Sequence, residues 1–507
     1  MRFLVFVVAF HAVGCGATPS PSAPESLQPP RELTILYTAD EHGWLAAKKD
    51  AYAHLGGASQ FLSALIDHEH HCPGSLDRGG VAIHPRRDHC PSKTLLLSGG
   101  DNFTGPALST QLRGQPVADT MRVLGYSAAA FGNHELDFGR EAFLSNRERS
   151  GVRYLAANMV HEDGSASDLA EPYAIFERDG IRIGVIGIAT EKTLEVGMRK
   201  RFEGLHFESV EATLDRTVPR VWAEGSDAVI VIAHECHDVL APIFLRHPEW
   251  KIAFVGTGHC HRSAAIRAGE TLLLGPAWGL SHYGRAKLRF HPEKPQRERA
   301  ELVDWQLIDV NTPLEKPAAS GDFAFDVALA GWQAQVDHEL GERIGHSRGF
   351  SAASETMPRW VLGAWLDAYP QADFALTTRG ALRQDMPAGP VTLATVQSIL
   401  PFDNDLVVLK LPREEVAALA SRAKSLVAGL RCEKNACTKS DGTELPPMVT
   451  LVTTDFLYFG GDGYALEKYD ASPTMTKVGW REPVLAWTRR AASTTDAPLE
   501  TKLEKTR

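Results

Sequence analysis

Residues Leu33 to Gly43 read LTILYTADEHG, an apolar run that ends in alternating charged side chains. The β-branched and aromatic residues of its first half are typical of a buried strand. In an extended chain, residues two apart point to the same side, so Asp40 and His42 can bind one metal ion together. This stretch therefore predicts a strand that carries metal ligands at its C-terminal end.

Four further polar groups follow apolar runs or lie in glycine-rich turns. They read SGGDN at 98–102, FGNHE at 131–135, VIAHE at 231–235 and GHCH at 258–261. Each group alone is a weak signal, but together they supply a set of nitrogen and oxygen ligands that zinc, manganese or cobalt accepts. The carboxylate of Asp101 has two oxygens and can bridge two ions. The candidate ligands are Asp40, His42, Asp101, Asn133, His234, His259 and His261.

Short apolar runs alternate with stretches that favour helices. The strand-like runs are 33–37, 94–97, 181–188, 228–232 and 252–255, and 58–69 and 209–223 are helix-compatible. This alternation predicts a layered α/β domain. Two prolines at 311–320, helical spacing at 323–340 and strand-like runs at 374–377, 406–411 and 448–453 predict a linker and a second domain. We expect a first domain at 32–310, a linker and bridging helix at 311–340, a second domain at 341–490 and a disordered tail at 491–507.

Composition excludes several classes of protein. A length of 507 residues allows roughly two to four domains, and 44% apolar with 23% charged residues is typical of soluble globular chains. A net charge of −10 argues against non-specific binding to nucleic acid polymers or anionic membranes. The sequence specifies no oligomeric state.

The first residues are typical of an export signal. Met1 and Arg2 precede the apolar run 3–10, and small residues lead to Cys15. The run is too short to span a hydrocarbon layer of ~30 Å. Its cysteine resembles that of bacterial lipoprotein signals, which implies cleavage of residues 1–14, a lipid on Cys15 and a tether rich in Pro and Ser at 15–31. We therefore expect a periplasmic or surface protein anchored only by that lipid; the alternative is ordinary secretion with a free thiol.

Six cysteines remain, an even number that favours disulfides in an exported chain. Cys432–Cys437 would close a small loop and Cys72–Cys90 a larger polar one, and both are plausible disulfides. Cys236 and Cys260 each lie beside a histidine after an apolar run, where a third disulfide and two buried thiols are both possible. The candidates are Cys72, Cys90, Cys236, Cys260, Cys432 and Cys437.

The five polar groups in their order resemble the calcineurin-type metallophosphoesterases. Three later segments resemble the C-terminal domain of bacterial 5′-nucleotidases: TRGALR at 378–383, PFDN at 401–404 and FLYFGGDGY at 456–464. The resemblance covers about residues 33 to 465. It implies a four-layer metallophosphoesterase β-sandwich flanked by helices, followed by a smaller α/β substrate domain.

The resemblance also implies roles for individual residues. Asp40, His42, Asp101 and His261 would hold one ion, and Asp101, Asn133, His234 and His259 the other. His134, oriented by Asp137, would stabilise phosphoryl charge or protonate the leaving oxygen. The remaining implied site residues contact the substrate: Phe402 and Phe456 stack on a base, Asn404 and Asp462 contact base or ribose, and Arg383 with Arg379 binds phosphate. Because the family usually has Asn-Gly-Gly where this chain has Thr378-Arg379-Gly380, we expect an altered phosphate clamp.

The activity implied by the resemblance is that of an exported dinuclear-metal phosphohydrolase. It would release phosphate from 5′-nucleotides, and the expectation extends to 2′,3′-cyclic nucleotides and nucleotide sugars. Two alternatives stay open: a thiosulfohydrolase of the same architecture, which needs no base sandwich, and a non-catalytic surface protein that binds nucleotides.

Overall fold

Two six-stranded sheets pack face to face in the computed structural model, which describes residues 31–49, 54–78, 81–83, 93–310, 323–433 and 436–503. The first sheet runs β18 (Ala300–Asp309), β17 (His282–Phe290), β1 (Arg31–Thr38), β6 (Thr94–Ser98), β7 (Ala128–Ala130) and β8 (Arg153–Leu155). The second runs β10 (Tyr173–Arg178), β11 (Ile181–Ala189), β13 (Ala228–His234), β14 (Phe254–Thr257), β16 (Thr271–Pro276) and β15 (Ser263–Ala268). Apolar side chains fill the space between them.

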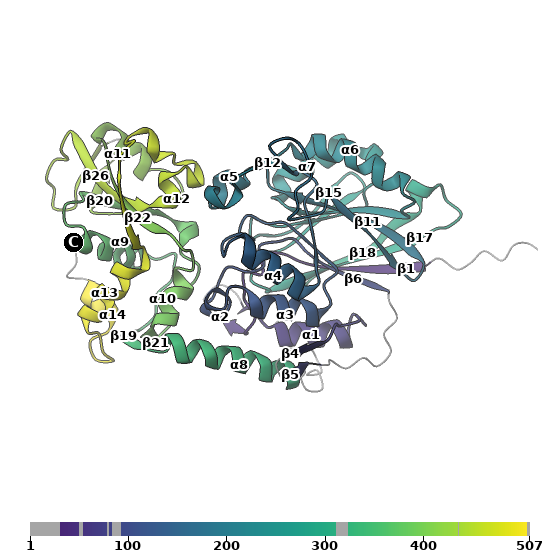
Figure 1. Cartoon of the computed structure of the whole chain (residues 1–507), viewed down its shortest axis with the longest axis horizontal. Helices are drawn as coiled ribbons and strands as arrows, with labels where there is room; N and C mark the ends of the chain where they lie inside the picture. The colour runs from purple at the N-terminus through teal and green to yellow at the C-terminus, as the bar shows by residue number, and fades with distance from the viewer. Residues whose placement is uncertain are drawn as a thin grey trace, which may run out of the picture.

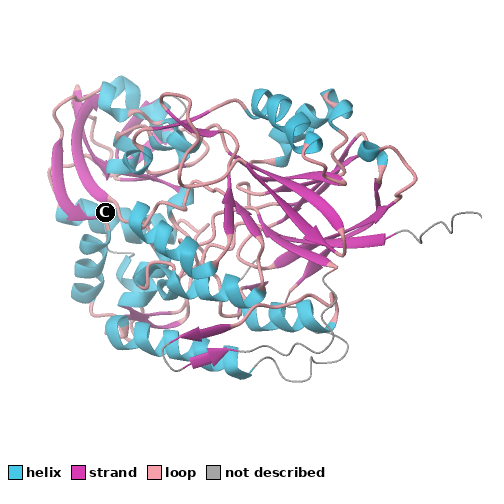
Figure 2. Ribbon diagram, turned by 45° about the vertical axis from the view of Figure 1, so that its right-hand side comes forward, coloured by secondary structure: helices cyan, strands magenta, loops and turns pink. Residues whose placement is uncertain are grey.

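Helices cover the outer face of each sheet (Figures 1 and 2). α1 (Ala58–Asp67), α3 (Gln115–Leu124) and α4 (Arg140–Ser150) lie on the first sheet, and α6 (Val210–Ala223) and α7 (His237–Arg246) on the second. Successive side chains of a strand point to opposite faces, so Tyr37 faces the other sheet and Leu36 faces the helices. Both faces are buried, which explains why the strands read as nearly continuous apolar runs. The predicted four-layer sandwich is confirmed.

Parallel pairing brings the ends of the central strands together. β1 pairs with β6, with Thr38 opposite Ser98, and β7 continues the sheet in the same direction. In the second sheet β13 and β14 are parallel, with Ala233 opposite Thr257. The polar groups that follow these strands therefore meet at one edge of the sandwich, where α/β proteins commonly place their sites.

α8 (Phe323–Leu340) leads to a second, smaller unit (Figure 1). Its sheet runs β23 (Ser425–Ala428), β20 (Phe374–Thr378), β26 (Met448–Thr454), β22 (Asp405–Pro412) and β27 (Thr474–Gly479). One face is covered by α9 (Thr356–Ala368) and α13 (Arg481–Ala491), where Trp360, Trp365 and Trp480 are fully buried. α11 (Arg413–Ala420) and α12 (Asp455–Tyr458) pack on the other face.

Shorter elements complete the chain. The two-stranded pairs are β2 (Lys48–Lys49) with β3 (His54–Leu55), β4 (Leu76–Arg78) with β5 (Val81–Ile83), β9 (Met159–His161) with β12 (Leu205–Phe207), β19 (Arg343–Ser347) with β21 (Gly389–Thr392), and β24 (Leu430–Glu433) with β25 (Ala436–Lys439). The short helices are α2 (Ala107–Gln111), α5 (Thr193–Val196) and α10 (Leu393–Ile399). No helix in the described ranges is long and apolar enough to cross a membrane.

The end of the chain corrects one expectation, because residues 491–503 are not a disordered tail. They include α14 (Leu499–Leu503), which packs against α9 and β19. Leu499 and Leu503 lie four apart on one helix face and are buried in the core of the second unit. Ser347 donates a hydrogen bond to Glu500, which fixes the helix to β19. The many charged residues around these two leucines hide the apolar spacing in the sequence.

Two candidate disulfides join described residues: the expected Cys432–Cys437, and Cys236–Cys260, which the sequence left open. Cys90, Cys15, the signal and tether at 1–30, and the connector at 311–322 lie outside the described residues.

Candidate metal centre and substrate cavity

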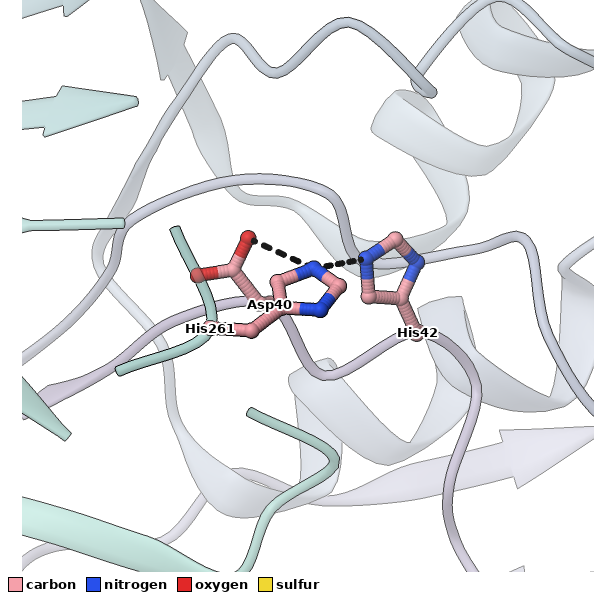
Figure 3. A group of neighbouring side chains, drawn as sticks. All are labelled: Asp40, His42 and His261. Carbon is pink, nitrogen blue, oxygen red and sulfur yellow. Dashed lines mark hydrogen bonds and ion pairs between the residues drawn. The ribbon is translucent and has the colours of Figure 1, made fainter. Parts of the chain in front are cut away.

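Asp40, His42 and His261 converge from two loops at the edge of the sandwich (Figure 3). The Nε2 atoms of the two histidines are 3.0 Å apart, and Nε2 of His261 is 3.6 Å from Oδ1 of Asp40. Oδ2 of Asp40 is buried and has no hydrogen-bond partner. A buried carboxylate oxygen without a partner is costly, and a bound cation would satisfy it.

Asp101, His234 and His259 form a second group beside the first. Nε2 of His234 lies 3.1 Å from Oδ2 of Asp101 and 3.3 Å from Nδ1 of His259. The side-chain oxygen of Asn133 is also 3.1 Å from Nε2 of His234. The structure thus places one carboxylate, two imidazoles and one amide oxygen around a common point.

The carboxylate of Asp101 faces both groups. Its Oδ2 is 3.1 Å from Nε2 of His234 and 3.7 Å from Nε2 of His42. Its Oδ1 accepts the backbone N–H of His134 at 2.8 Å, which holds the carboxylate in place. The seven predicted ligands therefore lie in one cluster, with Asp101 at its centre.

Backbone carbonyls orient the histidines. Nδ1 of His42 lies 2.9 Å from the carbonyl oxygen of Thr104, and Nδ1 of His234 lies 2.8 Å from that of Gly99. Because Nδ1–H donates to a carbonyl, each Nε2 faces the cluster, the orientation that metal ligation requires. Although burial opposes the charged form, the carboxylates of Asp101 and Asp40 raise the pKa of His234 to about 10, so a metal ion bound there would displace the Nε2 proton. Burial lowers the pKa of His42 and of His261, which keeps these imidazoles neutral and able to bind a cation.

Most of the ligand residues occupy strained backbone positions. Five have φ in the left-handed region: Asp40 (54°), His42 (45°), Asp101 (58°), His259 (68°) and His261 (54°). Such conformations cost about 1–3 kcal/mol each and persist where the surrounding structure enforces them. Gly132 allows the close approach, since a Cβ there would lie 2.2 Å from Oδ1 of Asp101.

Two buried glutamates support these loops and were not among the predicted site residues. Glu135 accepts backbone N–H groups of Asp101, Asn102 and Gly132 at 2.7–3.1 Å, and burial raises its pKa to about 7. Glu41 accepts hydrogen bonds from Thr38 and Ser98 on the two neighbouring strands. Each glutamate directly adjoins a predicted site residue in the sequence. The available signal is this adjacency in the sequence.

His134 lies beside the cluster and contacts the second unit. Its Nδ1 is 2.8 Å from Oδ2 of Asp137, and its Nε2 is 3.0 Å from Nη2 of Arg383. Its ring stacks on Phe402 with the centroids 5.1 Å apart. Burial alone would lower the pKa of His134, but the carboxylates of Asp137 and Asp101 outweigh this effect and raise it.

A cavity of about 670 Å³ opens between the metal cluster and the second unit. From the first unit it is lined by the ligands Asp101, Asn133, His259 and His261 together with His134 and Lys192. From the second unit it is lined by Thr378, Arg383, Phe402, Asn404, Lys424, Phe456 and Asp462. The guanidinium of Arg383 lies 4.9 Å from the centre of the Phe402 ring. The cavity thus joins a candidate metal site to aromatic and cationic groups.

Comparison with known proteins gives a consistent result. Residues 343–468 match the family described as 5′-nucleotidase, C-terminal domain. The 5′-nucleotidase of Vibrio cholerae is 26% identical over 461 residues, which cover 81% of this chain and 79% of that protein. The predicted resemblance to the bacterial 5′-nucleotidases is confirmed. The nucleotidase relatives are phosphoesterase hydrolases, the enzyme class that the sequence predicts.

Solved structures share the fold over nearly the whole chain. A 5′-nucleotidase precursor from Thermus thermophilus superposes with a TM-score of 0.73 at 20% identity, covering 93% of this chain and 99% of that one. The sulfate thiohydrolase SoxB of the same organism superposes with a TM-score of 0.69 at 16% identity, covering 91% and 94%. This architecture is therefore common to nucleotidases and to a thiohydrolase.

Within the segment that matches the 5′-nucleotidase C-terminal domain family, one expected residue lies apart from the cavity. Arg379 is exposed and does not line it; it begins the short 3-10 turn Arg379–Ala381 that follows β20. Asp462 is instead held by Thr378, which belongs to the altered clamp, and by Lys424, which the sequence did not indicate. Thr378 donates to one of its oxygens at 2.8 Å, and Nζ of Lys424 lies 3.1 Å from the other. Lys424 lies in a polar loop, and no local motif marks it.

Proposed function

We propose that this chain is an exported dinuclear-metal phosphohydrolase that releases phosphate from 5′-nucleotides. The observation that carries the proposal is the position of Asp101, whose Oδ2 lies between two ligand groups at the floor of the cavity. The opposite wall belongs to a 5′-nucleotidase C-terminal domain. Such an arrangement suits a substrate that has both a phosphate and an aromatic base.

The residues fit a pair of divalent cations. Asp40, His42, Asp101 and His261 would hold one, and Asp101, Asn133, His234 and His259 the other. When bound, two such ions of zinc, manganese or cobalt would neutralise phosphate charge and lower the pKa of the attacking water. The buried, unpartnered Oδ2 of Asp40 and the inward-facing Nε2 atoms of His42 and His234 support this assignment.

The chain's own residues would bind and orient the phosphate. Arg383 offers paired N–H donors to phosphate oxygens, and its Nε is buried without a hydrogen-bond partner. His134 is held by Asp137 with Nε2 directed at Arg383. A phosphate between these two side chains would accept from both, and the imidazolium of His134 would place its proton at the leaving oxygen.

Two aromatic residues would hold the base. Phe402, in a loop, and Phe456, in the short helix α12, both line the cavity. The ring of Phe402 stacks on His134 in this structure, so a base would replace that contact. Stacking on an aromatic side chain contributes about 1–3 kcal/mol per base without selecting one base. Asn404 and Asp462, which also line the cavity, would contact base or ribose edges.

Substitution of Phe456 tests the choice of substrate. Phe456→Ala should raise the KM for AMP by roughly tenfold or more while leaving p-nitrophenyl phosphate hydrolysis within about twofold, because only the nucleotide stacks. Phe459→Ala is the matched control, since this phenylalanine lies in the same segment but is 44% exposed and does not line the cavity. Equal losses on both substrates would contradict the base sandwich.

A thiosulfohydrolase is the second candidate, favoured by the fold shared with the sulfate thiohydrolase. It would use the same metal site, and Phe402 and Phe456 would then be dispensable. Assaying 5′-nucleotides, 2′,3′-cyclic nucleotides, nucleotide sugars and a protein-bound thiosulfonate with each metal separates the two activities. Turnover of the thiosulfonate alone would replace the nucleotidase proposal. A chain that binds nucleotides and metals but hydrolyses none of these substrates would instead be a binding protein.

We also propose that the chain is exported and anchored by a lipid on Cys15. The basic start, the apolar run and the cysteine support a lipoprotein signal. The two disulfides of the described residues support an oxidising compartment. Cys15→Ala should release the protein from the membrane fraction of its host, and an unchanged distribution would contradict the lipid anchor.

A further inference from the structure

The disulfide Cys236–Cys260 lies among the candidate metal ligands. Cys236 follows His234 by two residues, and Cys260 stands between His259 and His261. We propose that this disulfide is a clamp that holds the three histidines in the geometry that binds metal. The inference rests on the proposed metal centre and adds a positioning role for a pair of residues that bind neither metal nor substrate.

The clamp joins two loops just beyond the point where their strands stop pairing. β13 ends at His234 and β14 at Thr257, and the last paired residues are Ala233 and Thr257. Beyond that point one backbone hydrogen bond crosses between the loops, from Gly258 to the carbonyl of Glu235 at 3.3 Å. The disulfide, with Cα atoms 5.3 Å apart, is therefore the strong connection between the loop after His234 and the loop that carries His259 and His261.

The loop that the clamp holds is strained. His259 and His261 have φ of 68° and 54°, in the left-handed region, and Cys260 lies between them. Non-glycine residues keep such angles only where their surroundings enforce them. One restraint is the hydrogen bond from the N–H of His259 to Oδ1 of Asp40 at 2.9 Å. The ring of His261 also stacks on Trp278, and Arg262 forms an exposed ion pair with Asp238 of the other loop. The disulfide is the covalent restraint, and without it a return to ordinary φ values would turn both imidazoles away from the cluster.

Preorganisation links this restraint to metal affinity. A cation that meets fixed ligands does not have to order them on binding, so rigid sites bind more tightly. His234 is already fixed by Gly99 at one end of the clamp. The clamp extends that order to the second loop, which supplies one histidine to each of the two ligand groups.

The other described disulfide offers a matched control. Cys432–Cys437 closes a short hairpin between β24 and β25, and neither cysteine lines the cavity. Both Cys236 and Cys260 do line it and are half-buried, so a dissolved reductant that enters the cavity can approach this disulfide. A water-soluble phosphine would attack one sulfur, and water would complete the reaction to give two thiols and the phosphine oxide. Serine variants isolate the clamp more cleanly, because free thiols beside Asp238 could themselves bind metal.

The test compares two double variants of the full chain. Cys236→Ser with Cys260→Ser should weaken manganese affinity at least tenfold, measured by competition with a chelator of known affinity. Cys432→Ser with Cys437→Ser should stay within twofold of the parent. Equal affinity in all three proteins would overturn the clamp, whereas a parent that binds no manganese would overturn the metal centre instead.

A second measurement does not require the Cys236→Ser, Cys260→Ser variant to fold. The folded, manganese-loaded Cys432→Ser, Cys437→Ser protein is treated with the phosphine and then with a thiol-alkylating reagent, so that the new thiols cannot bind metal, and mass spectrometry identifies the cysteines that were reduced. Release of manganese, followed by the electron paramagnetic resonance signal of the free ion, should accelerate at least tenfold once Cys236–Cys260 is open. Unchanged release after its complete reduction would overturn the proposal.

Discussion

Asp101 explains most of the site's organisation at the scale of single residues. Its two oxygens have different partners: Oδ1 accepts the N–H of His134, and Oδ2 faces His42 and His234. Burial opposes ionisation of Asp101, but the surrounding histidines lower its pKa well below the usual range. A permanently ionised carboxylate at this point is what a bridging ligand between two cations requires.

His134 should be needed for turnover and not for metal binding. It touches Asp137, Arg383 and the ring of Phe402 but belongs to neither ligand group. His134→Ala should lower kcat by roughly 10²–10⁴-fold, the range for a lost proton donor. Metal content, measured by mass spectrometry of the purified protein, should stay at the parent value. Full turnover with metals bound would remove His134 from the mechanism.

His71 should make stability fall in weak acid. Its imidazole is buried between Thr94 Oγ1 at 2.7 Å and the carbonyl of Leu124 at 3.0 Å, and burial lowers its pKa to about 4. The unfolded chain has the ordinary pKa of ~6.5, so the unfolded state binds more protons between these values. The contribution of His71 is therefore complete above pH ~6.5 and is lost as the pH falls towards 4, about 3 kcal/mol in all.

Denaturant unfolding at several pH values measures this contribution. His71→Gln does not titrate and should show a shallower fall in stability between pH 6.5 and 4 than the parent. The exposed neighbour His68 gives the control, because His68→Gln should keep the parent's slope. Parallel plots of unfolding free energy against pH for the parent and His71→Gln would show that folding does not lower the pKa of His71.

Single residues also show which parts of the site could not be predicted from the sequence. The convergence of the seven candidate ligands and the contact of His134 with Asp137 could be predicted, because each residue lies in a short motif that follows a strand. Lys424 could not, because its contact with Asp462 depends on the packing of a loop 38 residues away in sequence. Arg379 failed to reach the cavity for the same kind of reason, since its position is set by the turn after β20.

At the scale of elements, the two sheets fit together through an aromatic side chain and a glycine. The ring of Tyr37 on β1 packs against Gly256 on β14, where an added Cβ would lie 2.3 Å from ring carbons. Both residues belong to buried strands at the centre of their sheets. The spacing of the sheets, and with it the meeting of their polar ends, depends on the absence of a side chain here.

Gly256→Ala should therefore destabilise the first unit. The extra methyl group forces the sheets apart or displaces Tyr37, and overpacking of this kind costs about 1–3 kcal/mol. Gly331→Ala in the exposed part of α8 is the control, because nothing lies within 4 Å of its added Cβ. It should leave stability unchanged or raise it by ~0.5–1 kcal/mol through better helix propensity. Chemical denaturation measures both, and a neutral Gly256→Ala would contradict the tight packing.

The positions of the strands were easier to predict than the pairing between them. The apolar runs at 33–37, 94–97, 181–188 and 228–232 all became strands, because buried strands have a local signature. The run at 252–255 shifted to Phe254–Thr257, because pairing with Val231–Ala233 of β13 sets its limits. Membership of one sheet or the other depends on contacts far apart in the sequence, and α14 was missed because its two leucines become significant only against α9.

At the scale of the whole molecule, the two units meet around the cavity. Arg383 and Phe402 reach His134, and Ser398 accepts the backbone N–H of Ala107 at 2.8 Å. Lys200 of the first unit forms an ion pair with the buried Asp455 of the second at 3.4 Å. These contacts hold the candidate substrate-binding residues next to the candidate metal ligands, the arrangement that the proposed phosphate transfer to water needs.

Lys200→Ala should weaken this arrangement modestly. Lys200 is 60% exposed, so the pair contributes about 0–1 kcal/mol. The KM for a nucleotide should rise up to about fivefold at low ionic strength, and the difference from the parent should vanish in high salt, where exposed charges are screened. Arg199→Ala removes an exposed cation from the same short helix and serves as the control. Equal effects of the two variants would mean that net charge, and not the ion pair, is responsible.

Anomalous diffraction from a crystal soaked in manganese tests the central claim most directly. Asp101 should be flanked by two peaks about 3.5–4 Å apart. One peak should lie beside Asp40, His42 and His261, and the other beside Asn133, His234 and His259. A crystal that shows no pair of peaks at this carboxylate would contradict the account.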